Sequence, residues 1–280
     1  VDARLKVGGP ATAAAGWIAD FASHLVESRG ALDFLATHTY GNVPLDVAAT
    51  AAAAGLQERP VWWTEWGVSP LHFAPVNDAV LGAPFILHGM FSAMDRAEYL
   101  AYWVLSDHFE ELGRPPRLFH GGFGLLTVGN LRKARYWAGR MLELLGPDRL
   151  QTTVSGDGAD SLVQAIATRD PAGLVQVLVW NGTLDQTKLD GSAILGRRLE
   201  LRIADLPGAR YHVEHRRLDE EHSNVKRLWR ELGSPDWPDA AGWERLRRQD
   251  RLENLHPPRE MAVSGGRLNL EFDLPMPGVS

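Results

Sequence analysis

Residues 61–70, with the sequence VWWTEWGVSP, carry a carboxylate at the end of an apolar, tryptophan-rich run. We expect a short β-strand that ends near Glu65, because a glycine and a proline follow. Strict alternation along that strand places Trp63 and Glu65 on one face and Thr64 on the other. An acid at the C-terminal tip of such a strand suits a barrel enzyme, whose chemistry lies at that end of the strands. The alternative is a solvated glutamate without a chemical role.

Other polar side chains are expected at the ends of neighbouring strands. His38 and Tyr40 follow an apolar stretch at residues 31–36, and because they are two apart they share one face. Tyr40 can donate a hydrogen bond to a carboxylate nucleophile and keep it ionised. Trp103, which can stack on a sugar ring, precedes three acidic residues: Asp107, Glu110 and Glu111. These residue types suit carbohydrate chemistry, because carboxylates and histidine form hydrogen bonds with hydroxyl groups.

Other chemistries fit the sequence less well. His38, Glu65 and Asp107 are possible metal ligands by type, but their spacing matches no metal-binding motif. No Gly-x-Ser-x-Gly sequence marks a serine hydrolase, and no cysteine is present for thiolate catalysis or disulfides. The glycine-rich residues 121–124 lack the lysine and the preceding strand of a phosphate-binding loop.

Length and composition describe a globular protein with an ample core. The chain has 280 residues, of which 45% are hydrophobic and 23% charged. The formal net charge of -6, with no basic stripe, argues against nucleic-acid binding. No apolar run reaches the roughly 18 residues that a membrane span needs. The first residue is Val1, so we expect a chain cut from a longer protein; the lack of cysteines and of a signal peptide slightly favours the cytoplasm.

The first 146 residues alternate between predicted strands and helices. Predicted strands lie at residues 5–7, 31–36, 61–65 and 99–105, and predicted helices at 17–25, 46–56, 77–98 and 133–145. Repeated strand–helix units predict a parallel sheet flanked by helices. A complete barrel needs eight units and roughly 250 residues, so four units predict the second half of a TIM (β/α)8 barrel.

After residue 147 the pattern changes to short strands separated by turns. They are predicted at residues 161–167, 173–180, 198–203, 211–215 and 267–274. Such spacing predicts an all-β sandwich domain. Two amphipathic stretches, at about 223–233 and 239–255, predict a helical insertion. The expected domains are therefore 1–147, the barrel half, and 148–280, the sandwich with its helical insert at about 223–255.

Several segments, in order along the chain, resemble glycoside hydrolase family 39, which includes β-xylosidases and α-L-iduronidases. They are VGGPA at 7–11, THTY at 37–40, TEW at 64–66, YWVLSDHFEE at 102–111, FHGGFGLLT at 119–127 and LDEEHSN at 218–224. The resemblance implies a retaining glycosidase on a (β/α)8 barrel, with this chain supplying strands 5–8 and the β-sandwich. It implies Glu65 as the nucleophile, with His38, Tyr40, Trp103, Glu110 and Glu111 as substrate-binding residues.

The family's acid/base glutamate lies in an Asn-Glu-Pro motif, which this sequence lacks. A retaining mechanism needs two carboxyl groups, so we expect the acid/base outside this chain and the 280-residue fragment to be inactive alone. No metal or organic cofactor is expected. The expected partner is a carbohydrate, either a xylo-oligosaccharide or an aryl or alkyl β-xyloside, with a homo-oligomer as an open possibility.

Residues 67–70, GVSP, depart from the better known xylosidases, which carry an asparagine there. β-Xylosidase is the favoured activity. The alternatives are a retaining glycosidase with another glycone, such as an iduronidase-like enzyme, or a non-catalytic sugar-binding protein.

Overall fold

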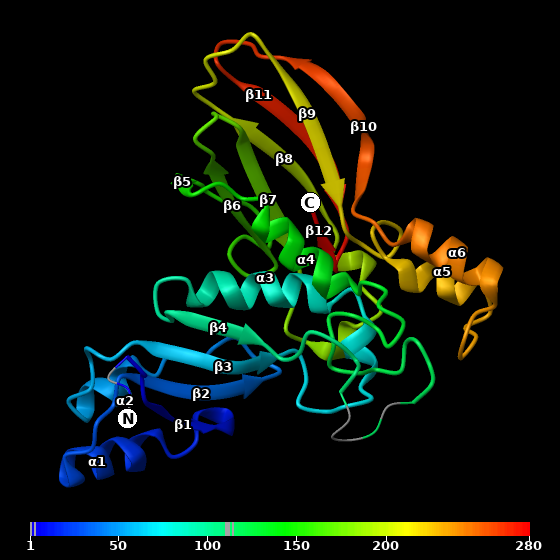
Figure 1. Ribbon diagram of the computed structural model, residues 1–280. Helices are drawn as coiled ribbons and strands as arrows, with labels where there is room; N and C mark the ends of the chain where they lie inside the picture. The colour runs from blue at the N-terminus through cyan, green and yellow to red at the C-terminus, as the bar shows by residue number, and fades with distance from the viewer. Residues whose placement is uncertain (1, 3, 110–112, 114) are drawn as a thin grey trace. The chain divides into compact units, whose positions relative to one another are not determined.

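The computed structural model describes residues 2, 4–109, 113 and 115–280. The chain divides into two compact units, which are coloured along the sequence in Figure 1. The first unit contains Val1–His72 and His88–Leu105, and the second contains Phe73–Leu87 and Ser106–Ser280. In the described part of the chain, no helix is both long enough and apolar enough to cross a membrane.

The first unit is built on a parallel sheet of four strands in the order β1-β2-β3-β4. The strands are β1 (Gly8–Thr12), β2 (Phe34–Tyr40), β3 (Val61–Gly67) and β4 (Tyr99–Tyr102). A short 3-10 helix η1 (Ala13–Ala15), α1 (Ile18–Ser28) and α2 (Ala48–Ala53) connect the first three strands, and α3 (Gly82–Ala93) precedes β4. Because the strands are parallel, their C-terminal ends lie at one edge, as the arrows in Figure 1 show.

Helices α1 and α2 are held to the sheet by apolar side chains. Leu35 of β2 is 1% exposed and forms a cluster with Leu32 and Ala51, against which Phe21 and Leu25 of α1 pack. Each such side chain contributes about 1.5–3 kcal/mol when fully buried. The apolar residues at helical spacing in α1 therefore pack against the sheet, as the sequence predicted.

Several predicted bounds in the first 105 residues differ from the structure. The first strand is β1 (Gly8–Thr12), not residues 5–7, and it contains Pro10. Proline has no N–H to donate, and the pairing of β1 with β2 shifts register between Pro10 and Thr12, which accommodates it. The long helix predicted over residues 77–98 is shorter: a 3-10 turn η2 (Pro75–Asp78) comes first, and α3 ends at Ala93.

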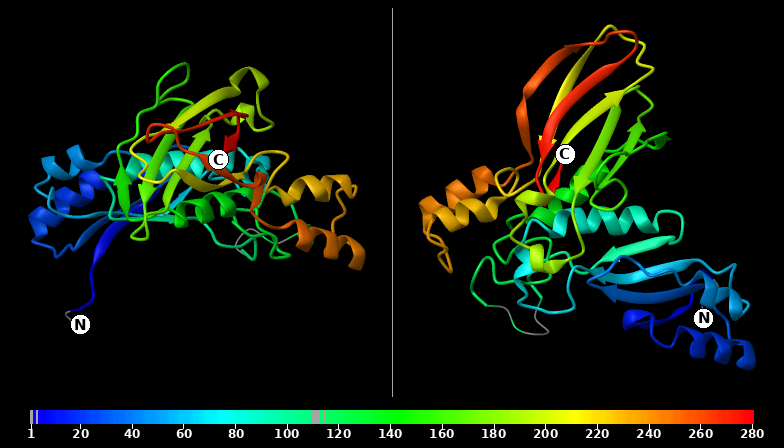
Figure 2. Two further views of the ribbon diagram at one scale, coloured as in Figure 1. Left: turned by 90° about the horizontal axis from the view of Figure 1, so that it is seen from above. Right: turned by 180° about the vertical axis from the view of Figure 1, so that it is seen from behind.

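The second unit contains three antiparallel sheets. The largest has the order β12-β7-β6-β5, and the others pair β8 with β11 and β9 with β10. Figure 2 shows these strands from above and from behind. Their bounds are β5 (Asp148–Leu150), β6 (Val163–Arg169), β7 (Val175–Asn181), β8 (Arg197–Ile203), β9 (Arg210–Arg217), β10 (Glu253–Ala262), β11 (Leu268–Leu274) and β12 (Gly278–Val279), with 3-10 turns η3 (Gln186–Lys188) and η4 (Ala193–Leu195).

Apolar clusters join the elements in the described part of this unit. In one, Val163 of β6 and Val179 of β7 contact Leu274 of β11, so side chains of two sheets share a core. Another cluster joins α5 (Val225–Glu231) and α6 (Ala240–Gln249) to the loop that precedes α4 (Ala134–Glu143). Its members are Leu118, Phe119, Leu131, Val225, Leu228, Trp229 and Leu246, with Trp243 packed against them.

The structure has a strand in each of the five stretches predicted after residue 147, and three more that the sequence did not predict. The unpredicted strands are β5, β10 and β12. β10 replaces the end of the helix predicted over 239–255 and contains Pro257 and Pro258. Its pairing with β9 shifts register between Asn254 and His256 and again between His256 and Arg259. The prolines disrupt regular pairing, which is why this stretch did not read as a strand.

A buried ion cluster holds the glycine-rich loop at residues 121–124. The ammonium of Lys133 lies 2.6 Å from Asp78 Oδ1 and 2.7 Å from Asp107 Oδ2, and it donates to the carbonyl of Gly122 at 3.0 Å. The two carboxylates also accept from the loop's backbone, Asp78 from Gly121 N and Asp107 from Gly124 N. Because glycine has no side chain to pack, hydrogen bonds from these charged groups to the backbone help to hold the loop.

The cluster is stable only because its charges compensate one another. Burial by itself would raise the pKa of Asp78, but the ammonium groups of Lys133 and Lys226 outweigh it and hold that pKa below its ordinary value of 3.8. Asp78 therefore contributes stability above pH 3.8, and the contribution is lost as the pH falls towards the lower pKa of the folded state.

We predict that Lys133→Met destabilises the protein by about 3–5 kcal/mol at pH 7, because it leaves two buried carboxylates without their shared cation. The measurement is urea unfolding followed by tryptophan fluorescence. The difference from the unmodified protein should shrink as the pH is lowered, because burial without Lys133 raises the pKa of Asp78 and the variant takes up the proton at a higher pH than the unmodified protein does.

The matched control is Lys188→Met, which removes the same charge from an exposed position. It should change the free energy of unfolding by less than about 0.5 kcal/mol. Equal effects of the two substitutions would show that the cluster does not stabilise the fold.

Candidate active site

A β-bulge in β3 decides which way Glu65 points. The strands β2 and β3 pair regularly up to Thr37 and Trp63, but His38 then pairs with Glu65, so that Thr64 is an extra residue. Thr37 and His38 face opposite sides of β2, and therefore Trp63 and Glu65 do too. The prediction that Trp63 and Glu65 share a face is wrong, because a bulge interrupts the alternation on which it depended.

The bulge brings Glu65 to the side chains at the end of β2. The hydroxyl of Tyr40 donates to Glu65 Oε2 at 2.7 Å. His38 Nδ1 lies 3.5 Å from the same oxygen. The Glu65 side chain is 29% exposed, whereas that of His38 is 14% exposed. The carboxylate is therefore held by Tyr40 and flanked by His38, while part of it stays accessible to a ligand.

Thr64 is part of this group, although alternation predicted that it faces away. Its Oγ1 lies 2.9 Å from Nε2 of His38, so the imidazole touches Thr64 with one nitrogen and Glu65 with the other. No pattern in the sequence announces the extra residue of a bulge, and reasoning from alternation could not have found this contact.

The aromatic residues around Glu65 anchor the strand on its other side. Trp66 is completely buried, donates through its indole N–H to the carbonyl of Asn42 at 2.8 Å, and meets the ring of Tyr102 edge to face at 5.8 Å. Gly89 of α3 leaves the space for this indole, because a Cβ at that position would overlap it. Packing on one face of β3 thus fixes the position of the carboxylate on the other.

Trp103 directly follows β4 and is tied to β3. Its backbone N–H donates to the carbonyl of Trp66 at 2.8 Å, and its side chain is half-buried. The peptide between Trp103 and Val104 is cis. At Gly67, a Cβ would come within 3.1 Å of the Tyr40 ring and 3.4 Å of the Trp103 carbonyl. The absence of a side chain at Gly67 helps the tips of β2, β3 and β4 to approach this closely.

Other polar residues of the motifs lie elsewhere or are not described. Glu110 and Glu111 lie outside the residues that the structure describes. Asp107 is fully buried in the ion pair with Lys133, which agrees with a structural role. His120 lies within the loop of the second unit, where Nδ1 contacts the carbonyl of Arg117 at 2.8 Å. In the described ranges, no group of three or more histidine, aspartate or glutamate side chains is arranged to hold a metal ion.

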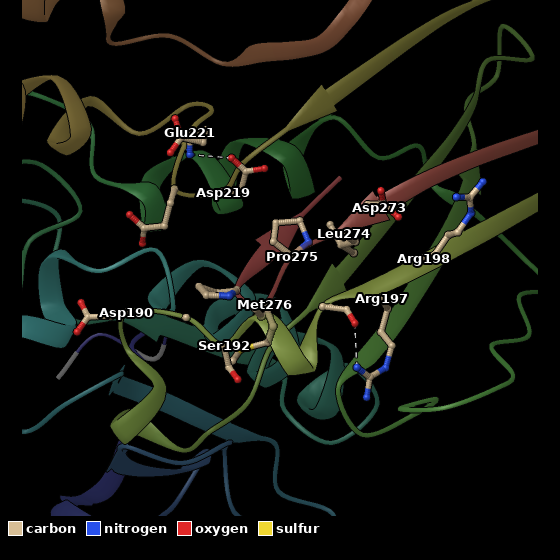
Figure 3. Close-up of a pocket in the computed structure, with 15 residues that line it drawn as sticks. Asp190, Ser192, Arg197, Arg198, Asp219, Glu221, Asp273, Leu274, Pro275 and Met276 are labelled. Atoms are coloured by element: carbon tan, nitrogen blue, oxygen red, sulfur yellow. Dashed lines mark hydrogen bonds between the residues drawn. The ribbon is translucent and has the colours of Figure 1, made fainter.

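A pocket of about 610 Å³ lies in the second unit and is shown in Figure 3. Asp190, Arg197, Asp219, Asp273 and Met276 are among the residues that line it. Among the described residues, His38, Tyr40 and Trp103 are not part of its lining, and no aromatic side chain is. It therefore lacks the flat apolar surface on which a sugar ring stacks.

Comparison with known proteins places this arrangement in a class. Solved structures with the same fold include the GH39 enzyme from Xanthomonas axonopodis pv. citri, with 24% identity and a TM-score of 0.83, and a monomeric beta-xylosidase from Caulobacter crescentus CB15, with 26% identity and a TM-score of 0.81. Each match covers 98% of this chain, but 59% and 60% of those chains. The chain has an α/β glycosidase fold, with a partly exposed carboxylate at the ends of parallel strands.

The family follows from the sequence match. The model of the family "Glycosyl hydrolases family 39" matches residues 1–266, and the chain belongs to that family. A beta-xylosidase from Caldicellulosiruptor saccharolyticus is 29% identical over 98% of this chain. The chain spans 58% of that relative. The resemblance inferred from the short motifs is confirmed.

We predict that Gly89→Ala destabilises the protein by roughly 1–3 kcal/mol, because the added methyl group must displace the buried indole of Trp66. Urea unfolding measures the change. The comparison variant is Gly139→Ala in the middle of α4, where a Cβ meets no atom within 4 Å. It should stabilise the protein by roughly 0.5–1 kcal/mol, since alanine favours a helix over glycine. If both substitutions stabilise, Gly89 does not make the space for Trp66.

Proposed function

We propose that this chain supplies the nucleophile of a retaining β-xylosidase that releases terminal xylose from xylo-oligosaccharides. The observation that carries the proposal is the Glu65 carboxylate, partly exposed, held by Tyr40 at 2.7 Å and flanked by His38 at the end of a parallel strand. Family membership supports the reaction class, and the beta-xylosidase relatives support the glycone.

The proposed reaction is a double displacement. A Glu65 oxygen attacks the anomeric carbon, the bond from that carbon to the leaving oxygen breaks, and an acid protonates the departing oxygen. Water, deprotonated by the same group acting as base, then hydrolyses the glycosyl ester and restores Glu65. Because Oε2 holds the hydrogen bond from Tyr40, attack through Oε1 leaves that bond intact during the reaction.

The acid/base is proposed to be a glutamate in an Asn-Glu-Pro motif outside this chain. Supporting this, the sequence contains no such motif, and the chain spans 58% of its curated relative. The carboxyl oxygens of a retaining pair must come within about 5–5.5 Å, so the second carboxylate must stand opposite Glu65 at the ends of the remaining strands. In this proposal, Trp103, Glu110 and Glu111 bind the sugar together with His38 and Tyr40.

The proposed domain arrangement follows the same logic. The sheet β1-β2-β3-β4 has the parallel order and the connecting helices of four consecutive barrel strands, and we assign it to strands 5–8 of a (β/α)8 barrel. The antiparallel strands are assigned to a β-sandwich with the pair α5 and α6 inserted. A boundary at residues 147 and 148 falls between α4, which ends at Glu143, and β5, which begins at Asp148.

We predict that Glu65→Gln in the intact protein lowers kcat for an aryl β-xyloside by roughly 10⁴–10⁶-fold, because the amide cannot form the glycosyl ester. The exposed carboxylate Glu58 provides the matched control, and Glu58→Gln should retain activity. Circular dichroism and urea unfolding check that both variants fold. Near-native turnover by a folded Glu65→Gln protein would refute the assignment.

A chemical trap identifies the nucleophile directly. The departure of dinitrophenolate from a 2-deoxy-2-fluoro-xyloside needs no acid, so the glycosyl ester can form on the attacking carboxylate. The ester accumulates there and is located by peptide mass spectrometry. The label is expected on Glu65. A label on another carboxylate would assign the nucleophile elsewhere.

The glycone is tested with a panel of aryl glycosides, because residues 67–70 depart from the better known xylosidases. We expect kcat/KM for the β-xyloside to exceed that for the β-glucoside by roughly 10–200-fold, the discrimination that one extra group in a fitted pocket gives. A preference for a uronide would instead support an iduronidase-like enzyme. Saccharide binding without turnover of any glycoside would support a non-catalytic sugar-binding protein.

A further inference from the structure

The contact of Thr64 with His38 suggests a role that the reaction scheme above does not contain. We propose that Thr64 is a positioning residue, whose hydroxyl holds His38 in the tautomer with the proton on Nδ1, so that the ring presents an N–H to Glu65. The proposal rests on the proposed function only in taking Glu65 as the nucleophile. The tautomer itself is a property of the protein without substrate.

Nδ1 of His38 lies beside the carboxylate of Glu65. It lies 3.5 Å from Glu65 Oε2, and an ionised carboxylate has only lone pairs to offer. A lone pair on Nδ1 would be repelled by that oxygen, whereas an N–H there is attracted to it. The electrostatics of this pair therefore favour the proton on Nδ1.

Nε2, the other nitrogen of the His38 ring, lies beside the hydroxyl of Thr64. In the neutral ring with the proton on Nδ1, Nε2 carries a lone pair and can only accept. The hydroxyl of Thr64, 2.9 Å away, is able to donate to it. A hydrogen bond at one ring nitrogen sets the tautomer that the other presents, as it does for histidines that bind metals. Glu65 favours the proton on Nδ1, and with that tautomer the Thr64 hydroxyl donates to Nε2, so that both ring nitrogens have a matching neighbour.

The backbone geometry of β3 makes both contacts possible. Successive residues of a regular strand face opposite sides, so Thr64 and Glu65 could not both reach one imidazole. The bulge between β2 and β3 removes that obstacle, since two residues of β3 stand opposite His38. The His38 side chain is 14% exposed, so the ring has little freedom to turn away from either contact. The bulge therefore does more than aim the carboxylate: it places a tautomer-setting hydroxyl next to it.

The opposite assignments are distinguishable. A ring protonated on Nε2 would donate to Thr64 and turn a lone pair towards Glu65. An imidazolium would donate from both nitrogens, with Thr64 accepting. The nitrogen chemical shifts of histidine separate these three states, because protonated and unprotonated ring nitrogens resonate far apart.

The experiment is a long-range ¹H–¹⁵N correlation spectrum of the intact protein with ¹⁵N-labelled histidine at pH 7. The His38 signals are assigned as those lost in His38→Gln, and the signals of the remaining histidines report on the fold. We expect the unmodified protein to show the proton on Nδ1. A proton on Nε2, or on both nitrogens, would overturn the proposal.

Two substitutions test the role of the hydroxyl. Thr64→Val removes it at similar volume and should shift His38 towards the Nε2 tautomer or a mixture of the two. Thr64→Ser keeps the hydroxyl and should restore the signals of the unmodified protein. A residue that merely packs in the strand would leave the tautomer unchanged in Thr64→Val, and that result would refute a positioning role.

Kinetics of the intact protein give a second readout. We expect Thr64→Val to lower kcat for an aryl β-xyloside by about 10–100-fold, the usual effect of removing a group that orients a site residue, with a smaller change in KM. Thr64→Ser should recover most of the loss. If the trap fails to label Glu65 while His38 keeps the Nδ1 proton, the proposed function fails and the tautomer assignment stands. If the trap labels Glu65 and the tautomer differs, only the present inference fails.

Discussion

The extra residue in β3 is the constraint on which the candidate site depends. With regular pairing to β2, alternation would turn Glu65 to the side of Trp63, away from His38. The shift at Thr64 instead sets Glu65 opposite His38, within reach of Tyr40. Bulges are common next to active sites because they redirect one side chain without displacing the strand that carries it.

The tryptophans around Glu65 explain why the strand can hold this geometry. Trp63 and Trp66 are 1% and 0% exposed, so the face opposite the carboxylate is filled with large rigid rings. Aromatic side chains bury more apolar area than any others, and a shift of the strand would expose that area. The small residues Gly67 and Gly89 complete the arrangement, one letting the strand ends approach and the other receiving an indole. Stability and positioning thus come from the same packing.

The second unit uses a buried ion cluster to hold its glycine-rich loop. Its loop at residues 121–124 contains three glycines and one large apolar side chain, the buried Phe123, so apolar packing holds only part of it. Lys133, Asp78 and Asp107 take over by binding its backbone groups from inside. Such a cluster gives directional bonds where a cluster like that of Trp229 and Leu246 gives only area.

The sequence by itself determined which residue types stand at the strand ends, the strand–helix alternation and the family. These are local properties: apolar periodicity marks β2 and β3 wherever they pair, and short motifs identify relatives. It did not determine β10, whose prolines hide a bulged strand, or the direction of Glu65 and Thr64. Only the tertiary structure decided these, because a bulge is a property of two strands in register. The partners that fix that register, like the carboxylates that Lys133 joins, lie far apart in the chain and meet only when it folds.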